Sequence, residues 1–524
     1  MLRQINSVLA RQIFLCLSAA ILIICSFPAA NIEIFAWFSF VPLFFALKDK
    51  TRLQAFLLSY FTGIIFWSGS IWWLAHVTLA GTILLILYLA LYFGLFGLII
   101  TSTEHPACRS GRRAPSTGWL FIPSLWVLLE YLRAYLLTGF PWALLGYSQY
   151  LNLPVIQIAD ITGVWGVSFL VMLVNVVIAQ VLDSRFWVPG QKETKIKLKI
   201  LASFFLLLSL SLAYGYYKLN LIPITPACPA GRQHLTPVKI SVIQPNIPQD
   251  LKWERSSRDY IISRYVDLTH QASQDKPDLI IWPEAALPVV LEEEPVYYEI
   301  VKDLVRKIKI PLVLGAVTLR DKLYYNSSLL VSADGQTSDI YDKLHLVPFG
   351  EYIPLRKALS FLETIAPIGD ITPGKEFRVF LKPARFSVLI CFEDLFPEIS
   401  RRFVREGAGF LVNITNDAWY KKTSAAYQHL QASVLRAVEN RVFLLRSANT
   451  GVSGFIHPTG KIISLVQGGH GENIFVSGYR TENVFVNKEG VLSFYSRFGD
   501  IFILLLFIFS LYHIFRFIRL KKLP

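Results

Sequence analysis

The feature that most restricts how this chain can fold is a series of long apolar runs. A transmembrane helix needs about 20 apolar residues to cross roughly 30 Å of hydrocarbon. Runs of this kind lie near residues 12–30, 54–75, 82–102, 118–137, 162–182, 199–217 and 500–517. A shorter run near 32–47 contains Glu33 and is counted as a further crossing. We therefore expect a polytopic α-helical membrane domain of about eight transmembrane helices, with a polar region before the last one.

The composition agrees with this prediction. Apolar residues make up 53% of the 524 residues and charged residues only 17%, as in chains that span a bilayer. A net charge of +14 would also suit a nucleic-acid partner, but the basic residues lie in short segments between apolar runs. No basic stripe is interleaved with aromatic residues. We expect contact with a membrane and not with nucleic acid.

The positions of the basic residues predict the orientation, because cytoplasmic loops are enriched in Lys and Arg. With the N-terminus in the cytoplasm, the segments on that side contain Arg3, Arg11, Lys48, Lys50, Arg52, Arg109, Arg112, Arg113, Arg185, Lys192, Lys195, Lys197, Lys199, Arg516, Arg519, Lys521 and Lys522. The opposite loops, 76–81 and 138–161, contain neither Lys nor Arg. Both termini are thus predicted to be cytoplasmic and the polar region to lie outside the cytoplasm.

Glu130 and Arg133 lie three residues apart inside the run 118–137, so they can pair on one helix face. A structural ion pair within the helix bundle is the plainer interpretation. Transport of protons or of a substrate is the alternative, and it would require further buried charges along a path.

From about residue 237 the pattern changes to short β-rich runs alternating with helical periodicity, which is typical of a layered α/β domain. Strands are expected over 239–244, 279–282, 311–317, 327–331, 386–391, 410–414 and 442–447, and helices over 255–273, 294–308, 395–406 and 424–440. The predicted domains are a transmembrane bundle (1–217), a linker (218–236), an α/β domain (237–495) and a transmembrane helix with a basic cytoplasmic tail (498–524).

Reactive side chains stand in three segments of the α/β region, next to apolar strands, where active-site residues often collect. Glu284 ends the segment IIWPE, Lys343 lies in YDKLHLVPFGEY, and Cys391 ends VLIC. Each has a plain explanation when taken singly: a solvated cap, a surface lysine and a small buried thiol. The five cysteines form no CxxC pair, which favours neither a metal cluster nor a disulfide framework. A disulfide between Cys228 and Cys391 is a further alternative.

Taken together, the three segments resemble the nitrilase (carbon–nitrogen hydrolase) superfamily, which uses a Glu–Lys–Cys triad in this chain order. The whole chain is similar to the apolipoprotein N-acyltransferase family, the membrane-embedded branch of that superfamily. The matching motifs are residues 244–249 (QPNIPQ) with Lys252 and Trp253, 282–284 (WPE), 343–354, 413–419 (NITNDAW), 138–142 (TGFPW), 146–149 (GYSQ) and 165–168 (WGVS). The resemblance implies a bacterial inner-membrane protein with a periplasmic, nitrilase-like αββα sandwich.

The resemblance also implies roles for individual residues. Cys391 would be the nucleophile, Glu284 the general base, and Lys343 the cation that stabilises thiolate and oxyanion. Supporting residues would be Glu351, Glu393 and Trp253, and possible lipid contacts Phe392, Tyr352, Leu359 and Phe361. Position 392, often Tyr in the family, is Phe here. Residues 352–366 are predicted either as a lid that guides acyl chains or as a helix packed on its own domain.

The implied reaction moves a fatty acyl group from a phospholipid, with phosphatidylethanolamine as the donor, to Cys391 as a thioester. The N-terminal amine of the S-diacylglyceryl cysteine of an apolipoprotein then accepts it, in a ping-pong cycle. No cofactor or metal is expected, since the histidines show no ligand spacing. The alternatives are a membrane-anchored amidase, which releases its product to water, and a transporter or lipid-binding protein, which has no need of Cys391.

Overall fold

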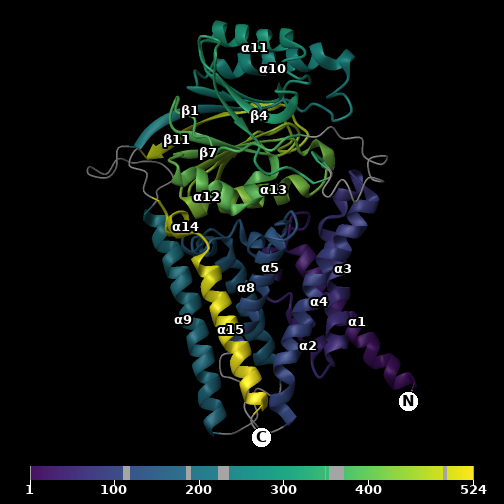
Figure 1. The fold of residues 1–524 in the computed structure, drawn as a ribbon. Helices are drawn as coiled ribbons and strands as arrows, with labels where there is room; N and C mark the ends of the chain where they lie inside the picture. The colour runs from purple at the N-terminus through teal and green to yellow at the C-terminus, as the bar shows by residue number, and fades with distance from the viewer. Residues whose placement is uncertain are drawn as a thin grey trace. The chain divides into compact units, whose positions relative to one another are not determined.

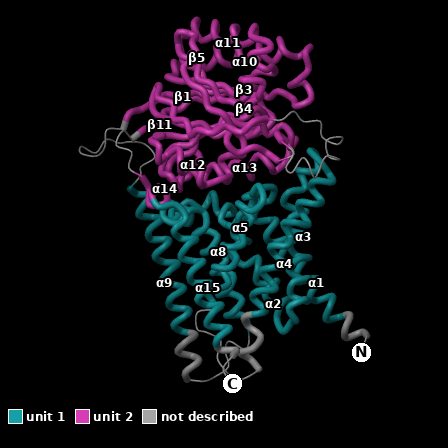
Figure 2. The backbone as a smooth tube through the Cα atoms, in the orientation of Figure 1, with its two compact units in different colours: residues 1–221, 498–524 teal, residues 222–497 magenta. Residues whose placement is uncertain are grey.

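The computed structural model describes residues 2–109, 118–183, 191–221, 235–348, 350–352, 371–487 and 492–522. Figure 2 shows that the chain forms two compact units. Residues 1–221 and 498–524 form one, here called the helical unit, and residues 222–497 form the other, here called the sandwich unit. Most of the predicted linker lies outside the described residues.

The helical unit consists of long apolar helices joined by shorter helical segments (Figure 1). Its long helices are α1 (Leu2–Cys25), α3 (Arg52–Ser70), α4 (Leu79–Arg109), α5 (Gly118–Tyr135), α8 (Val164–Leu182), α9 (Gln191–Leu221) and α15 (Ile501–Lys522). The shorter ones are η1 (Glu33–Trp37), α2 (Val41–Leu47), η2 (Trp72–His76), η3 (Leu145–Gln149), α6 (Leu153–Ile156) and α7 (Ala159–Thr162). Helix α3 begins with a capping box in which the Thr51 and Gln54 side chains accept from each other's backbone N–H groups.

Five helices of the described chain are long and apolar enough to cross a membrane: Ser7–Cys25, Leu79–Ser102, Val164–Leu182, Leu198–Leu221 and Ile501–Arg519. The chain is therefore a membrane protein. The predicted runs 54–75 and 118–137 form α3 and α5, and the run 32–47 is divided between η1 and α2. The total of eight crossings stays a prediction.

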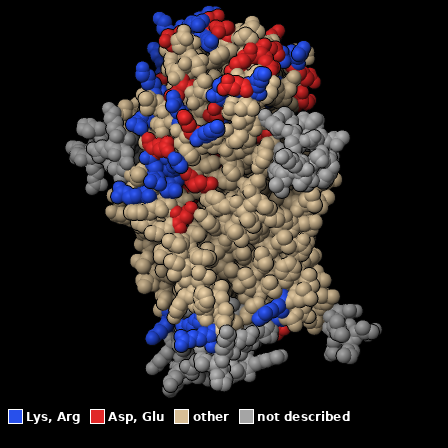
Figure 3. All heavy atoms as spheres, in the orientation of Figure 1, with Lys and Arg blue, Asp and Glu red and all other residues tan. Residues whose placement is uncertain are grey.

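The surface of the helical unit is apolar over most of its length. Large side chains such as Leu84, Phe205, Leu505 and Phe515 are more than half exposed. On the face of this unit seen in Figure 3, charged side chains are nearly absent between the helix ends, and Lys and Arg gather near one end. An apolar surface of this extent suits contact with lipid.

Glu130 and Arg133 of α5 are both buried, but each binds backbone groups rather than the other side chain. Arg133 donates to the carbonyl oxygens of Phe140 (2.6 Å) and Trp142 (2.8 Å). Glu130 accepts from the N–H of Leu145 at 2.7 Å. Within the described residues the two side chains form no direct salt bridge, although each charge acts on the other electrostatically. The predicted pair is therefore buried, but its members do not contact each other directly. The reason is that the buried segment after α5 has backbone groups that need partners.

The sandwich unit contains two β-sheets between two layers of helices (Figure 1). The six-stranded sheet has the order β11-β1-β2-β3-β4-β5, and the five-stranded sheet the order β10-β9-β8-β7-β6. Helices α10 and α11 cover the first sheet, and α12 and α13 cover the second. The predicted αββα sandwich is thereby confirmed.

The strands are β1 (Leu235–Gln244), β2 (Leu279–Ile281), β3 (Leu312–Arg320), β4 (Leu323–Val331), β5 (Thr337–Asp342), β6 (Phe386–Ile390), β7 (Phe410–Thr415), β8 (Phe443–Ala448), β9 (Gly454–Ile456), β10 (Ile462–Leu465) and β11 (Gly478–Asn487). The helices are η5 (Arg255–Ser257), α10 (Arg258–Ser273), α11 (Pro295–Ile308), η7 (Cys391–Leu395), α12 (Pro397–Arg405), η8 (Asp417–Tyr420), α13 (Ala425–Asn440) and α14 (Phe494–Phe498).

Four strands, β5, β9, β10 and β11, were not predicted. Strand β5 (TSDIYD) and strand β11 (GYRTENVFVN) are polar sequences at the edges of their sheet. An edge strand that is half exposed lacks the continuous apolar run that marks a central strand. Strands β9 and β10 have only three and four residues, too few for a periodicity to show.

Candidate active site

Glu284 follows the fully buried strand β2 and is held against β3. The N–H of Gly315 donates to the carbonyl oxygen of Pro283 at 3.1 Å. A side chain at Gly315 would lie 2.6 Å from the Cα of Glu284, so only glycine permits this approach. The next residue, Ala285, has a φ of 46°, a left-handed conformation that turns the chain away from the strand.

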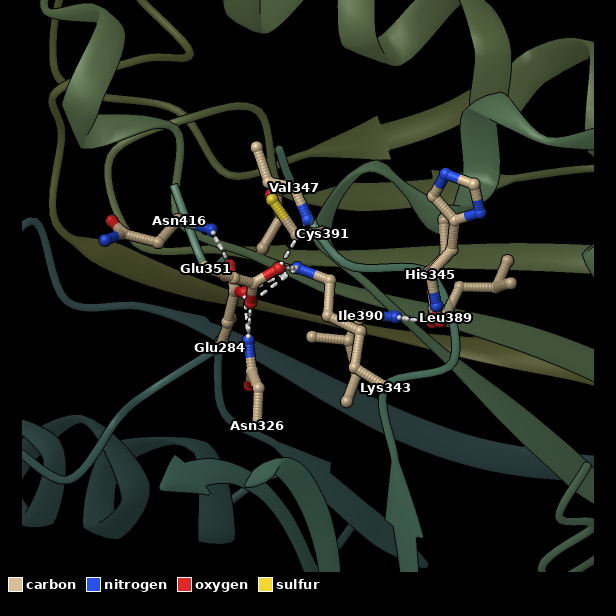
Figure 4. A network of polar contacts seen from close by, with 12 residues as sticks. Glu284, Asn326, Lys343, His345, Val347, Glu351, Leu389, Ile390, Cys391 and Asn416 are labelled. Carbon is tan, nitrogen blue, oxygen red and sulfur yellow. Dashed lines mark hydrogen bonds and ion pairs between the residues drawn. The ribbon is translucent and has the colours of Figure 1, made fainter. Parts of the chain in front are cut away.

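The Glu284 carboxylate is bound on both oxygens. Oε1 accepts from Asn326 Nδ2 at 2.8 Å and lies 3.5 Å from Lys343 Nζ. Oε2 accepts from the backbone N–H of Asn416 at 3.0 Å. Figure 4 shows Asn326 and Asn416 reaching Glu284 from different elements, with the Cys391 sulfur beside the cluster. Glu284 is thus fixed in orientation and only 7% exposed.

Lys343 follows strand β5, and its side chain is buried between two carboxylates. Its Nζ lies 3.0 Å from Glu351 and 3.5 Å from Glu284. Burial lowers the pKa of Lys343, but the Glu351 and Glu284 carboxylates outweigh burial and raise that pKa above its ordinary value. The ammonium therefore stays charged at neutral pH. Glu351 also accepts from Asn326 and from the N–H of Val347, both at 2.8 Å, so one amide side chain joins the two carboxylates.

Cys391 directly follows strand β6 and has a left-handed backbone conformation, with a φ of 56°. A side chain in this region is strained and persists only where its surroundings hold it. Here Asn413 Nδ2 donates to the Cys391 carbonyl oxygen at 2.7 Å, and the Thr415 hydroxyl lies 3.5 Å from the sulfur. Cys391 carries a free thiol, and Cys228 lies outside the described residues.

The thiol is protonated at rest. Burial raises the pKa of Cys391 well above its ordinary value, and the Glu284 charge raises it further while Lys343 lowers it. A buried thiol of this kind becomes a nucleophile only when a nearby group takes its proton. Glu284 and Lys343 both interact electrostatically with the sulfur.

Glu393 joins the Lys343 segment to the Cys391 turn. Its carboxylate accepts from the hydroxyl of Tyr341 (2.9 Å), from the N–H groups of Leu344 (2.7 Å) and His345 (3.1 Å), and from the N–H of Ile390 (2.8 Å). Burial raises the pKa of Glu393 to about 7. These contacts tie the two segments together next to the reactive groups.

The other expected site residues differ in exposure. Phe392 is 9% exposed, and its ring centroid lies 5.4 Å from Lys343 Nζ. Trp253 is 46% exposed and Tyr352 is partly buried. Leu359, Phe361 and nearly all of the predicted lid lie outside the described residues.

Sequence reasoning missed several residues that hold the site. Asn326 on β4 bridges two carboxylates, and Thr415 contacts the sulfur. Lys252 donates to the main chain of Glu284. Two signals were present: Lys252 and Thr415 stand in family motifs, and Asn326 is a polar residue directly before the predicted strand 327–331.

A second buried network of charged side chains includes Asp394, three residues after the nucleophile. His429 bridges Asp394 (2.8 Å) and Asp417 (3.0 Å). Arg446 Nη1 lies 3.0 Å from Asp394, and Ser433 donates to the same carboxylate. Burial lowers the pKa of His429, but Asp394 and Asp417 together outweigh burial, and that pKa is raised to about 9. Opposite charges match across this network, so it stabilises the turn that carries Cys391.

Among the described residues, no group of three or more His, Cys, Asp and Glu side chains is arranged to hold a metal ion.

Comparison with protein-family models gives two matches. The apolipoprotein N-acyltransferase N-terminal domain matches residues 19–177, and the carbon-nitrogen hydrolase domain matches residues 239–476. The fold and the second match place the sandwich unit in the carbon–nitrogen hydrolase class.

Similar proteins refine this class. The apolipoprotein N-acyltransferase of Geobacter metallireducens is 38% identical over 510 residues, covering 94% of this chain and 92% of the relative. That of Rickettsia typhi is 31% identical over 433 residues, covering 80% and 82%. The chain belongs to the apolipoprotein N-acyltransferase family. Among solved structures, the amidase of Nesterenkonia AN1, from the nitrilase superfamily, is 19% identical to this chain and superposes with a TM-score of 0.37. The match covers 50% of this chain and 93% of the amidase chain.

Proposed function

We propose that this protein transfers a fatty acyl group from a membrane phospholipid to the N-terminal amine of an apolipoprotein through a thioester on Cys391. As a member of its family the chain is an acyltransferase of lipoprotein biosynthesis. The observation that carries the mechanism is the placement of a buried thiol next to a carboxylate and an ammonium that lie 3.5 Å apart.

In the first half-reaction Glu284 takes the proton of the Cys391 thiol, and the sulfur attacks the carbonyl carbon of the phospholipid ester. Lys343 stabilises the negative charge that develops on the sulfur and then on the ester oxygen. When the bond between that carbon and the glycerol oxygen breaks, Glu284 returns its proton to the leaving oxygen. Lysophospholipid departs and a thioester remains.

In the second half-reaction the α-amine of an S-diacylglyceryl cysteine attacks the thioester carbonyl. The carbon–sulfur bond breaks, an amide forms, and Glu284 passes a proton from the amine to the sulfur. Glu351 acts on Lys343 and Glu393 on the Cys391 turn, both as positioning residues. Phe392 has no hydroxyl, so its part is limited to packing or acyl-chain contact.

Residues 1–217 and 498–524 would anchor the enzyme by eight crossings of the inner membrane, with both termini in the cytoplasm and residues 237–495 in the periplasm. The absence of Lys and Arg from segments 76–81 and 138–161 supports this orientation. Phosphatidylethanolamine is the proposed donor. Trp253 and Tyr352 are proposed lipid contacts, and residues 352–366, with Leu359 and Phe361, a proposed lid.

The test uses the full-length protein in phosphatidylethanolamine vesicles with a synthetic S-diacylglyceryl peptide. We expect an N-acylated peptide and an equal amount of lysophospholipid, both measured by mass spectrometry. Cys391→Ala should produce neither. Free fatty acid formed in place of the N-acylated peptide would indicate hydrolysis and overturn acyl transfer to the amine.

A further inference from the structure

Lys252 is a second buried lysine beside Glu284 that the steps above do not use. It lies between β1 and η5, and only 2% of it is exposed. Its Nζ donates to the main-chain carbonyl oxygen of Glu284 at 3.1 Å. Three segments of the chain therefore bind the three oxygens of Glu284. Asn326 and Asn416 donate to its carboxylate, and Lys252 donates to its main-chain carbonyl.

The segment that carries Lys252 is itself fixed to the same part of the site. Asn416 Nδ2 donates to the Gln249 side chain at 2.9 Å, and Asn449 Nδ2 donates to the Ile247 carbonyl oxygen at 2.8 Å. The loop that follows β1 and the loop that follows β7 are thus bound to each other. Any displacement of Lys252 would move a group that touches Glu284.

The positive charge of Lys252 has few negative charges near it. Burying an ammonium is unfavourable unless anions or strong acceptors surround it, and its hydrogen-bond acceptor here is a neutral carbonyl. The anion that acts on it at rest is the Glu284 carboxylate, and the Cys391 sulfur becomes a second one when its thiol loses the proton. Burial lowers the pKa of Lys252 to about 8 despite these two groups. The other titratable groups around this pair are Lys343, Glu351, Glu393, Asp417 and Tyr420.

A second cation has a use in this site. Lys343 already forms an ion pair with Glu351, and this carboxylate offsets part of the positive charge that Lys343 presents to the sulfur. During acyl transfer, negative charge passes from Glu284 to the sulfur and then to the ester oxygen. We propose that Lys252 is a positioning residue for this transfer: it fixes the main chain of Glu284 and supplies a second positive charge that favours the Cys391 thiolate. The inference rests on the proposed function.

The test separates the hydrogen bond from the charge. Lys252→Gln keeps an N–H donor for the Glu284 carbonyl, whereas Lys252→Met removes both donor and charge. The rate of thioester formation is followed by the intact mass of the full-length protein in phospholipid vesicles, across a pH series that brackets pH 8. Lys239→Met is the matched control, because Lys239 also donates to a main-chain carbonyl, that of Asp275.

We expect both neutral variants to form the thioester about 10–100-fold more slowly than wild type, with the pH–rate profile moved to higher pH. The control should stay near the wild-type rate. Wild-type rates and profiles in both neutral variants would overturn the role of Lys252 and leave the proposed function intact. If the wild type forms no thioester, the proposed function fails first.

Thermal unfolding of each variant shows whether it is folded. If neither neutral variant folds, Lys252→Arg carries the test, because it keeps the charge at the same place. Wild-type rates below pH 8 in this variant support the inference. If a folded Lys252→Arg protein instead has its pH–rate profile moved to higher pH, the positive charge at this position does not determine the profile, and the inference is overturned.

Discussion

The helical unit and the sandwich unit both bury charged side chains, but they give those charges different partners. In the helical unit, Arg133 and Glu130 bind backbone groups of the segment that follows α5. In the sandwich unit, Lys343 lies within ion-pair distance of both Glu284 and Glu351, beside a thiol. A charge bound to the backbone fixes a segment, whereas charges shared among side chains next to a nucleophile can change as a proton moves. We therefore assign structure to the first group and chemistry to the second.

The largest effect is expected from Glu284→Gln. The amide can still accept a hydrogen bond from Asn326, but it cannot take the proton of Cys391. Thioester formation should fall by about 10²–10⁴-fold with little change in stability, measured by intact mass after mixing with phospholipid. Glu292→Gln is the control, since Glu292 is a carboxylate that caps the N–H of Leu319. A rate close to wild type in Glu284→Gln would remove Glu284 as the base.

Arg133→Met tests the structural role assigned to the buried charges of the helical unit. The carbonyl oxygens of Phe140 and Trp142 lose their donor, and Glu130 is left buried without a neighbouring positive charge. We expect a loss of about 3–5 kcal/mol in the free energy of unfolding of the helical unit, seen in thermal unfolding in detergent. Thioester formation per folded molecule should stay near wild type. A large loss of rate in well-folded Arg133→Met protein would contradict the structural assignment.

Glu351→Gln sharpens the comparison within the site. The variant keeps an acceptor for Asn326 but removes the carboxylate that raises the pKa of Lys343. Lys343 should then be held less firmly, and thioester formation should slow by about 10–100-fold. Single-turnover kinetics beside Glu284→Gln provide the measurement. Losses of equal size in the two variants would indicate that Glu351 takes part in proton transfer rather than in positioning.

The smallest effect concerns pH. Burial lowers the pKa of His429, but the carboxylates of Asp394 and Asp417 together raise it to about 9. A folded-state pKa above the ordinary value of 6.5 stabilises the fold fully below pH 6.5 and loses that contribution as pH rises to about 9. The unfolding temperature of the wild type relative to His429→Gln should therefore fall over this range. A constant difference would show that His429 is not charged in the folded protein.

Much of the fold could be predicted from the sequence because its signals are strong. Apolar runs marked the long helices, and the strands β2, β6, β7 and β8 are buried at every residue and so appear as largely apolar segments. The edge strands β5 and β11 were not predicted, because half-exposed polar strands lack such an apolar segment.

The site was predictable only in part. Glu284, Lys343 and Cys391 were marked by their place near strands and by resemblance to a family. The residues that bind them, such as Asn326 and Lys252, act through contacts across long stretches of chain. No local pattern reveals such contacts. For the same reason the spacing of Glu130 and Arg133 suggested a mutual ion pair, although the partners of both charges come from the segment after α5.

The measurement that tests the central claim most directly is the location of the acyl group on the enzyme. Full-length protein is incubated with phospholipid alone and digested, and the peptide that contains Cys391 is analysed by mass spectrometry, with Cys391→Ala beside it. The account predicts a fatty-acyl adduct on Cys391 that hydroxylamine removes and that the variant lacks. N-acylated product formed by an enzyme that never carries this adduct, or by the Cys391→Ala variant, would contradict it.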